Sequence, residues 1–84
     1  MSVTVKFFAS VREALGASSE TLELPAGVAT VGALRAHLAE RGDAWRDALG
    51  SPALRMACNQ VMCGADAAIV DGAEVAFFPP VTGG

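Results

Sequence analysis

Alternating apolar and polar residues predict β-strands at both ends of the chain. Over residues 2–8, valine or phenylalanine takes every second position up to Phe7, and the same alternation recurs over residues 74–78. A period of two places alternate side chains on the same face of a sheet, so each strand has one face to bury. Phe8 follows Phe7 directly and is expected to point outward as a second apolar contact.

Shorter alternating stretches predict further strands in the middle of the chain. Residues 21–24 form a second strand that Pro25 ends, residues 54–58 form a third, and residues 61–63 pair with the third strand or extend it. Between these last two, the Asn59-Gln60 pair either fills a turn or offers hydrogen bonds to a partner.

Helical spacing indicates one main helix. Thr30 is a suitable N-cap, Val31, Leu34 and Leu38 fall on one side, and Gly42 is expected to end the helix. That apolar side must pack on the sheet.

Two shorter helices are also predicted. The Ser-x-x-Glu sequence from Ser10 to Glu13 has the form of a capping box, and Gly16 can close the turn that follows. Residues 43–49 form another short helix that Trp45 anchors.

The order strand, strand, helix, strand, strand predicts an α+β chain with the β-grasp, or ubiquitin-like, fold. We expect a mixed sheet of four to five strands, one main helix across one face and a protruding C-terminal tail. With 84 residues, the chain has room for a single domain over residues 1–84, in which residues 79–84 form the tail. The outer sheet face would remain available to partners, with Phe8 and Phe78 as the candidate contacts.

Composition narrows the possible functions. A net charge of −3 with six lysines and arginines gives no basic stripe for a phosphate backbone, so no nucleic acid partner is expected. No apolar run approaches a membrane span, and residues 1–10 lack the regions of a signal peptide, so we expect no membrane and a cytoplasmic location. The spacing of Cys58 and Cys63 matches neither a redox pair nor a zinc site, which favours half-buried or buried free thiols.

The last residues carry the candidate chemistry. Pro79 and Pro80 cannot donate to a β-ladder, so the chain is expected to leave the sheet stiff and extended. Four further residues would span about 13 Å, at about 3.3 Å each. No nucleophile with its base, paired carboxylates or metal cluster can be assembled elsewhere, which leaves the carboxylate of Gly84 as the reactive group.

Three segments resemble the small, sulfur-carrying subunits of molybdopterin synthase, which belong to the β-grasp sulfur carriers. They are residues 5–13, the Asn59-Gln60 pair and the ending DGAEVAFFPPVTGG over residues 71–84. The resemblance covers essentially the whole chain. Its most specific part is the Phe-Phe-Pro-Pro sequence before Gly83-Gly84, and one departure is Ala73, where the family commonly has an acid.

This resemblance implies a cycle. A ubiquitin-activating-type adenylyltransferase, supplying ATP and Mg²⁺, would convert the Gly84 carboxylate to an acyl-adenylate, and a sulfur donor protein would then leave a thiocarboxylate. The tail would enter the large catalytic subunit and donate sulfur to cyclic pyranopterin monophosphate, forming molybdopterin within a heterotetramer. No permanently bound cofactor or metal is implied. Besides Gly84, the residues expected to meet partners are Gly83, Thr82, Val81, Pro80, Pro79, Phe78 and Phe8.

Three other functions stay open at this point. The chain could carry sulfur for another pathway, such as thiazole synthesis or tRNA thiolation. It could be a ubiquitin-like modifier, which would form covalent conjugates through Gly84. A non-covalent interaction module would instead bind through its sheet face and tolerate loss of Gly83 and Gly84.

Overall fold

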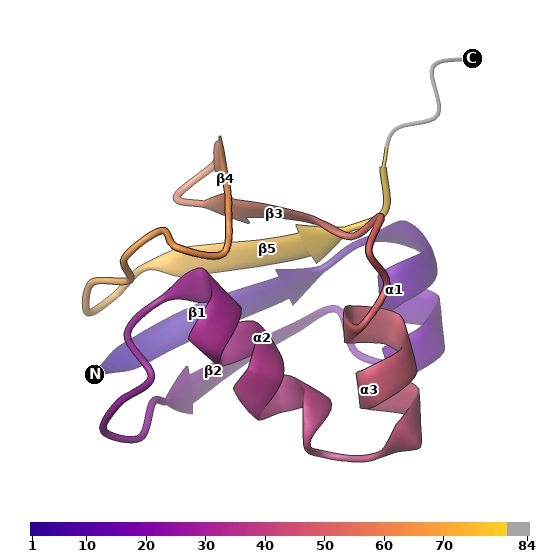
Figure 1. Ribbon diagram of the computed structural model, residues 1–84, viewed down its shortest axis with the longest axis horizontal. Coiled ribbons are helices and arrows are strands. Elements are labelled where there is room, and N and C mark those ends of the chain that lie inside the picture. Colours follow the sequence, from indigo (N-terminus) through magenta and orange to yellow (C-terminus); the bar gives the residue numbers. More distant parts are fainter. Residues whose placement is uncertain (81–84) are drawn as a thin grey trace.

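The structure is a computed structural model that describes residues 1–80 (Figure 1). One mixed sheet contains five strands, which lie in the order β2-β1-β5-β3-β4. The strands are β1 (Ser2–Phe7), β2 (Ser19–Glu23), β3 (Arg55–Cys58), β4 (Val61–Cys63) and β5 (Glu74–Phe78), and the helices are α1 (Ala9–Leu15), α2 (Val31–Ala39) and α3 (Asp43–Leu49).

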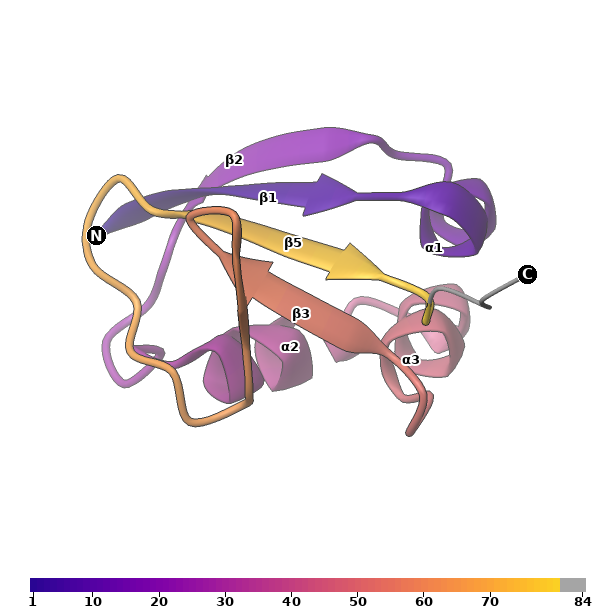
Figure 2. The ribbon, with the colours of Figure 1, turned by 90° about the horizontal axis from the view of Figure 1, so that it is seen from above.

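The last strand, β5, lies at the centre of the sheet. It pairs in parallel with β1, in a register that aligns Phe7 with Phe77, and antiparallel with β3, in a register that aligns Met56 with Phe77. β2 and β4 form the two edges, each antiparallel to its neighbour. Figure 2 shows this order from above, with α2 and α3 beneath the sheet and α1 beyond the end of β1.

The core lies between the sheet and the layer of α2 and α3. The alternation of the strands places Phe7 and Phe77 on this side, where their rings stack with centroids 6.3 Å apart. Trp45 of α3 meets the edge of Phe7 at 5.6 Å, and the Arg41 guanidinium covers the Trp45 ring. The largest fully buried side chains are Phe7, Phe77, Leu34, Leu38, Leu49, Val3, Val5, Val31 and Val75.

This arrangement confirms the predicted β-grasp fold and most of its elements. The hydroxyl of Thr30 accepts a hydrogen bond from the Ala33 N–H at 3.1 Å, as an N-cap should. The apolar side predicted for the main helix is buried. The predicted helix end was wrong, however, because α2 ends at Ala39 with Glu40 as its C-cap, while Gly42 is the N-cap of α3.

The capping box predicted at Ser10 was also wrong. The helix begins earlier, with Phe8 as its N-cap and without a side-chain capping bond. The Phe8 N–H donates to the Phe77 carbonyl at 3.2 Å, while the Phe8 carbonyl accepts from the Val11 N–H at 3.1 Å. Pairing with β5 therefore fixes Phe8 as the junction between strand and helix. Gly16 closes α1 in the left-handed conformation, as predicted.

Within residues 1–80, none of the helices combines the length and the apolar character that crossing a bilayer requires.

Candidate functional site: the tail root and the open sheet face

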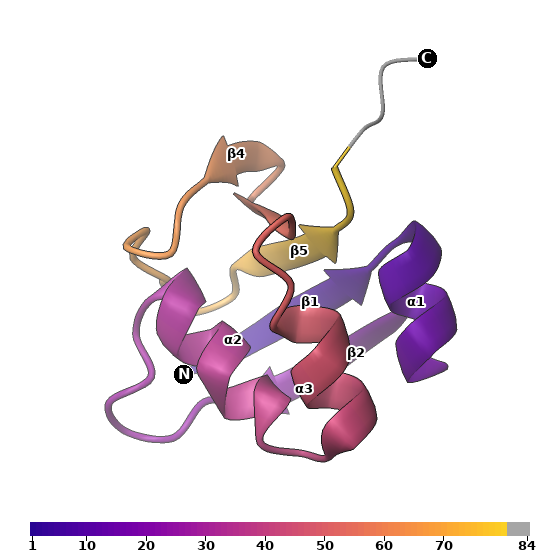
Figure 3. The ribbon, with the colours of Figure 1, turned by 45° about the vertical axis from the view of Figure 1, so that its right-hand side comes forward.

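The chain leaves the sheet from its central strand. β5 ends at Phe78, and Pro79 and Pro80 follow as half-buried residues without regular structure. Figure 3 shows this departure at the end of the sheet near α1, far from the N-terminus. We call Pro79 and Pro80 the tail root. The other predicted tail residues lie outside the described residues, namely Val81, Thr82, Gly83 and Gly84.

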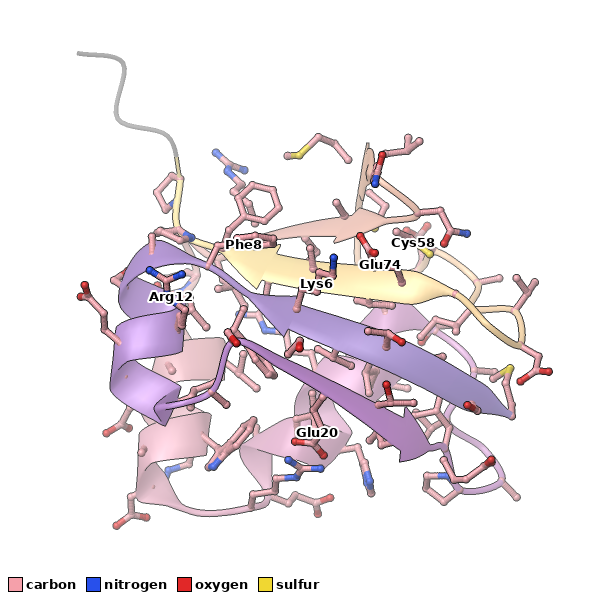
Figure 4. The ribbon with its side chains drawn as sticks, turned by 180° about the vertical axis from the view of Figure 1, so that it is seen from behind. Lys6, Phe8, Arg12, Glu20, Cys58 and Glu74 are labelled. Carbon is pink, nitrogen blue, oxygen red and sulfur yellow. The ribbon has the colours of Figure 1, made fainter. Side chains whose placement is uncertain are left out.

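Within residues 1–80, the sheet face opposite α2 and α3 carries no helix, and Phe8 lies at one end of it (Figure 4). By strand alternation and register, Phe78 shares this outer face with Ala76, Ala57 and Met62. Phe8 continues it beyond β1 and is 45% exposed, while Phe78 is half-buried. We call these five residues the outer apolar patch. Both phenylalanines predicted from the sequence are therefore placed on one surface beside the tail root.

Met62 is the member of the patch that sequence reasoning missed. Met62 is 61% exposed, and what distinguishes it from the equally exposed Val61 and Val70 is that it shares the outer face with Phe78. The turn at Asn59 and Gln60 sets the register that pairs Met62 with Ala57, on the outer face. A two-residue connection between alternating strands fixes such a register, so the turn was the signal that could have revealed it.

An ion pair borders the patch on the side of β1. The Lys6 ammonium lies 3.3 Å from a Glu74 carboxylate oxygen, and Figure 4 shows the two side chains directed toward each other across β1 and β5. Both are partly exposed, so solvent screens their attraction and the pair contributes little to stability.

The Asn59-Gln60 pair forms a turn, which confirms that prediction, while hydrogen bonds to a partner stay a prediction. Both residues have positive φ, 51° and 68°, as a tight hairpin requires. The Asn59 side-chain oxygen accepts from the Glu74 N–H at 3.0 Å, and the Asn59 N–H donates to the Glu74 carbonyl at 2.7 Å. Asn59 therefore fastens the hairpin to β5. The turn borders a shallow hollow of about 210 Å³ lined by Asn59, Gln60 and Glu74.

Ala73, the departure from the family pattern, lies just before β5 and is only 2% exposed. Its N–H donates to the Val70 carbonyl at 3.1 Å, and its carbonyl accepts from the Thr4 N–H at 3.0 Å. The side chain at this position faces the core and contacts no surface.

Within residues 1–80 there is no group of three or more His, Cys, Asp or Glu side chains arranged to hold a metal ion. Cys58 and Cys63 are half-buried free thiols, as predicted. Burial raises the pKa of the Cys63 thiol, and the nearby Cys58 and Asp66 raise it further. A thiol with a raised pKa is a weaker nucleophile at neutral pH, because less of it is thiolate.

The similarity of this chain to a known family extends over the folded domain and the C-terminal residues. A model of the ThiS family matches residues 5–84, nearly the whole sequence. The chain belongs to the ThiS family. A curated relative, the molybdopterin synthase sulfur carrier subunit of Escherichia coli (strain K12), is 48% identical over 82 residues, which cover 98% of the ThiS-family chain described here and 99% of that protein.

Solved structures resemble this ThiS-family chain over its full length. One is the complex of subunits 1 and 2 of molybdopterin-converting factor from Helicobacter pylori 26695, in which the matched chain is 25% identical, with a TM-score of 0.70 and coverage of 100% of both chains. Another is SAMP1 from Haloferax volcanii, 28% identical with a TM-score of 0.67 and the same coverage.

Proposed function

We propose that this protein is the sulfur carrier subunit of a molybdopterin synthase, acting in the cytoplasm, with the carboxylate of Gly84 as the group that carries the sulfur. The observation that carries the proposal is the 48% identity to a molybdopterin synthase sulfur carrier subunit over 98% of the chain. The match to the ThiS family extends to residue 84, so it includes the tail on which the chemistry is proposed.

The geometry of the tail root supports this role. β5 is held by ladders on both sides, and two residues without a backbone N–H follow it, so the sheet cannot extend along the tail. Residues 81–84 can then reach about 13 Å from the root when extended. A glycine end has no Cβ, so a narrow passage in another protein could accept it.

The chemistry would require other proteins. A carboxylate is a poor acyl donor, so an adenylyltransferase with ATP and Mg²⁺ would first convert the Gly84 carboxylate to an acyl-adenylate with release of pyrophosphate. A sulfur donor protein would then displace AMP and leave a thiocarboxylate. The thiocarboxylate would transfer its sulfur to cyclic pyranopterin monophosphate inside the large subunit.

The outer apolar patch is the proposed docking surface for the large subunit. Phe8 lies beside the tail root and is 45% exposed, and Met62 lies on the edge strand β4 of the same face and is 61% exposed, so a partner that receives the tail and covers this face would bury both. Burying a large apolar side chain contributes about 1.5–3 kcal/mol, which makes such residues effective anchors. The relative from Helicobacter pylori is itself described in a complex of two subunits.

Intact mass spectrometry tests the proposal. The protein is incubated with an adenylyltransferase, ATP, Mg²⁺ and a sulfur source, and we expect one oxygen to be replaced by sulfur at Gly84. A variant lacking Gly84 should keep its melting temperature but accept no sulfur and form no molybdopterin with the large subunit. Sulfur transfer by that truncated variant would refute the assignment.

A second candidate is a protein modifier, because a similar solved structure, SAMP1 from Methanosarcina acetivorans, is described as small archaeal modifier protein 1 and is 25% identical with a TM-score of 0.62. A modifier would form an amide between Gly84 and a lysine of another protein. Conjugates that resist boiling in detergent and thiol, and that disappear on deletion of Gly84, would support this alternative.

A further inference from the structure

Four of the six lysines and arginines of this acidic protein bind groups of the same chain, and the other two are exposed. Of the six lysines and arginines, Lys6, Arg41 and Arg46 lie in ion pairs within residues 1–80. Arg35 donates to the backbone carbonyls of Leu49 and Ser51. The two that remain are Arg12 and Arg55, and both are exposed without a carboxylate partner among the described residues.

Each of these two arginines stands beside one phenylalanine of the outer apolar patch. Arg55 opens β3 and pairs in register with Phe78, so both project from the outer face next to the tail root. Arg12 lies one helical turn after Phe8, whose carbonyl accepts its N–H at 3.4 Å. Figure 4 shows Arg12 on α1, at the end of the sheet from which the chain leaves β5.

The acidic side chains lie largely elsewhere. Glu74 is the exception on the outer face, where it pairs with Lys6. Asp47 lies on α3 in the helix layer, and Glu40 is the C-cap of α2. Glu13 follows Arg12 in α1, but neighbouring helix positions do not face each other, so it does not neutralise Arg12 directly. Two exposed arginines without an ion-pair partner within residues 1–80 therefore lie near the tail root of a protein whose net charge is −3.

Interfaces commonly combine an apolar centre with a charged rim, and rim charges govern encounter rate and orientation more than final affinity. An exposed cation without an ion-pair partner stays hydrated, and its charge is not cancelled, until another protein binds. Its electric field can therefore orient an approaching surface of opposite charge. On this molecule the two cations would fix the direction from which the tail approaches.

We propose that Arg12 and Arg55 form a cationic rim that pairs with carboxylates on the large subunit around the opening that receives the tail. This inference rests on the proposed function and adds the charge of the partner surface. The rim steers association, and the outer apolar patch then supplies the contact area. Arg55 and Arg12 act as specificity residues without touching the reacting thiocarboxylate.

Association kinetics with the purified large subunit test the rim. Arg55→Glu and the control Arg46→Glu change the net charge equally, from −3 to −5, but Arg46 lies on α3 in the helix layer. We expect Arg55→Glu to associate at least about fivefold more slowly at about 50 mM salt. The control should stay within about twofold of the original protein. At about 0.5 M salt the difference should largely vanish, because screening shortens the range of the interaction.

The outcomes separate the rim from the proposed function. If the unaltered protein does not bind the large subunit, the proposed function itself fails. If it binds and Arg55→Glu and Arg46→Glu associate at equal rates, only the rim is overturned. The same holds if Arg55→Glu slows loading by the adenylyltransferase but not association with the large subunit. Equal melting temperatures of the two variants exclude misfolding, and Arg12→Glu should reproduce the salt-dependent slowing.

Discussion

The hydrogen bonds of Asn59 lead to a prediction about stability that can be worked out atom by atom. Its side-chain oxygen accepts the Glu74 N–H at 3.0 Å, and its backbone has a φ of 51°. Asn59→Ala removes the acceptor from a half-buried strand, at a cost of about 1 kcal/mol. Alanine also tolerates the left-handed region poorly, which adds about 1 kcal/mol. We therefore expect the free energy of unfolding to fall by about 2 kcal/mol.

Two further substitutions at Asn59 separate these contributions. Asn59→Gly removes the acceptor but relieves the backbone, so its loss should be about 1 kcal/mol. Asn59→Asp keeps an oxygen at the same place and tolerates positive φ, so its loss should be about 0.5 kcal/mol, from repulsion by Glu74. Gln60→Gly is the matched control, since Gln60 has a similar φ of 68° but its side chain does not accept the Glu74 N–H, and it should leave stability unchanged or raise it.

Urea denaturation followed by circular dichroism measures all four variants. The slope of unfolding free energy against urea should stay constant, so that midpoint shifts report stability alone. For a domain of this size, the loss predicted for Asn59→Ala corresponds to a melting temperature lower by about 8–16 °C. If Asn59→Asp were as unstable as Asn59→Ala, the hydrogen bond to Glu74 would not be the source of the effect, and the reasoning would be wrong.

Two other predictions concern single contacts. The Arg41 guanidinium, through its hydrogen bond, holds the pKa of Glu20 below its ordinary value of 4.5. The contribution of this pair to the free energy of unfolding is therefore present above pH 4.5 and is lost as the pH falls through the lowered pKa. Glu20→Gln should remove this acid-dependent part, and because 33% of each side chain is exposed the loss at pH 7 should stay below about 1 kcal/mol. Gly32→Ala would place a Cβ 2.9 Å from the Ala65 carbonyl oxygen, so it should destabilise the protein by about 1–3 kcal/mol although alanine favours helices. A melting temperature raised by Gly32→Ala would contradict that packing argument.

The sequence predicted the elements whose causes are local. Thr30 caps α2 because its own side chain reaches the next turn, and residues 43–49 form α3 as the spacing indicated. The start of α1 has a distant cause, because the bond between the Phe8 N–H and the Phe77 carbonyl joins residues far apart in the chain. A capping-box pattern contains no information about that pairing, which explains why Ser10 was chosen wrongly.

The candidate site was predicted in the same uneven way. Phe8 and Phe78 were identifiable because each follows a strand residue whose side chain must face the core. Met62 required the register across the turn, and Arg55 required the pairing of β3 with β5. The absence of ion-pair partners for Arg12 and Arg55 within residues 1–80 becomes visible only when every carboxylate is placed in space. The neighbours of a residue across a strand or in space therefore cannot be predicted from the sequence pattern and must be taken from the fold.

The position of β5 sets a limit on how the tail can be altered. Because ladders on both sides hold this strand, a shift of the tail root along its own axis would break the registers with β1 and β3 together. It would also move Phe77 out of the core and Phe78 away from the outer apolar patch, since one residue of slip exchanges the two faces. An added or removed residue after Pro80 therefore cannot be compensated within the sheet, and it changes the reach of the tail by a full step of about 3.3 Å. Because β5 cannot slide, the reach of the tail depends only on the number of residues after Pro80. The depth of a cavity in another protein can be matched to that reach.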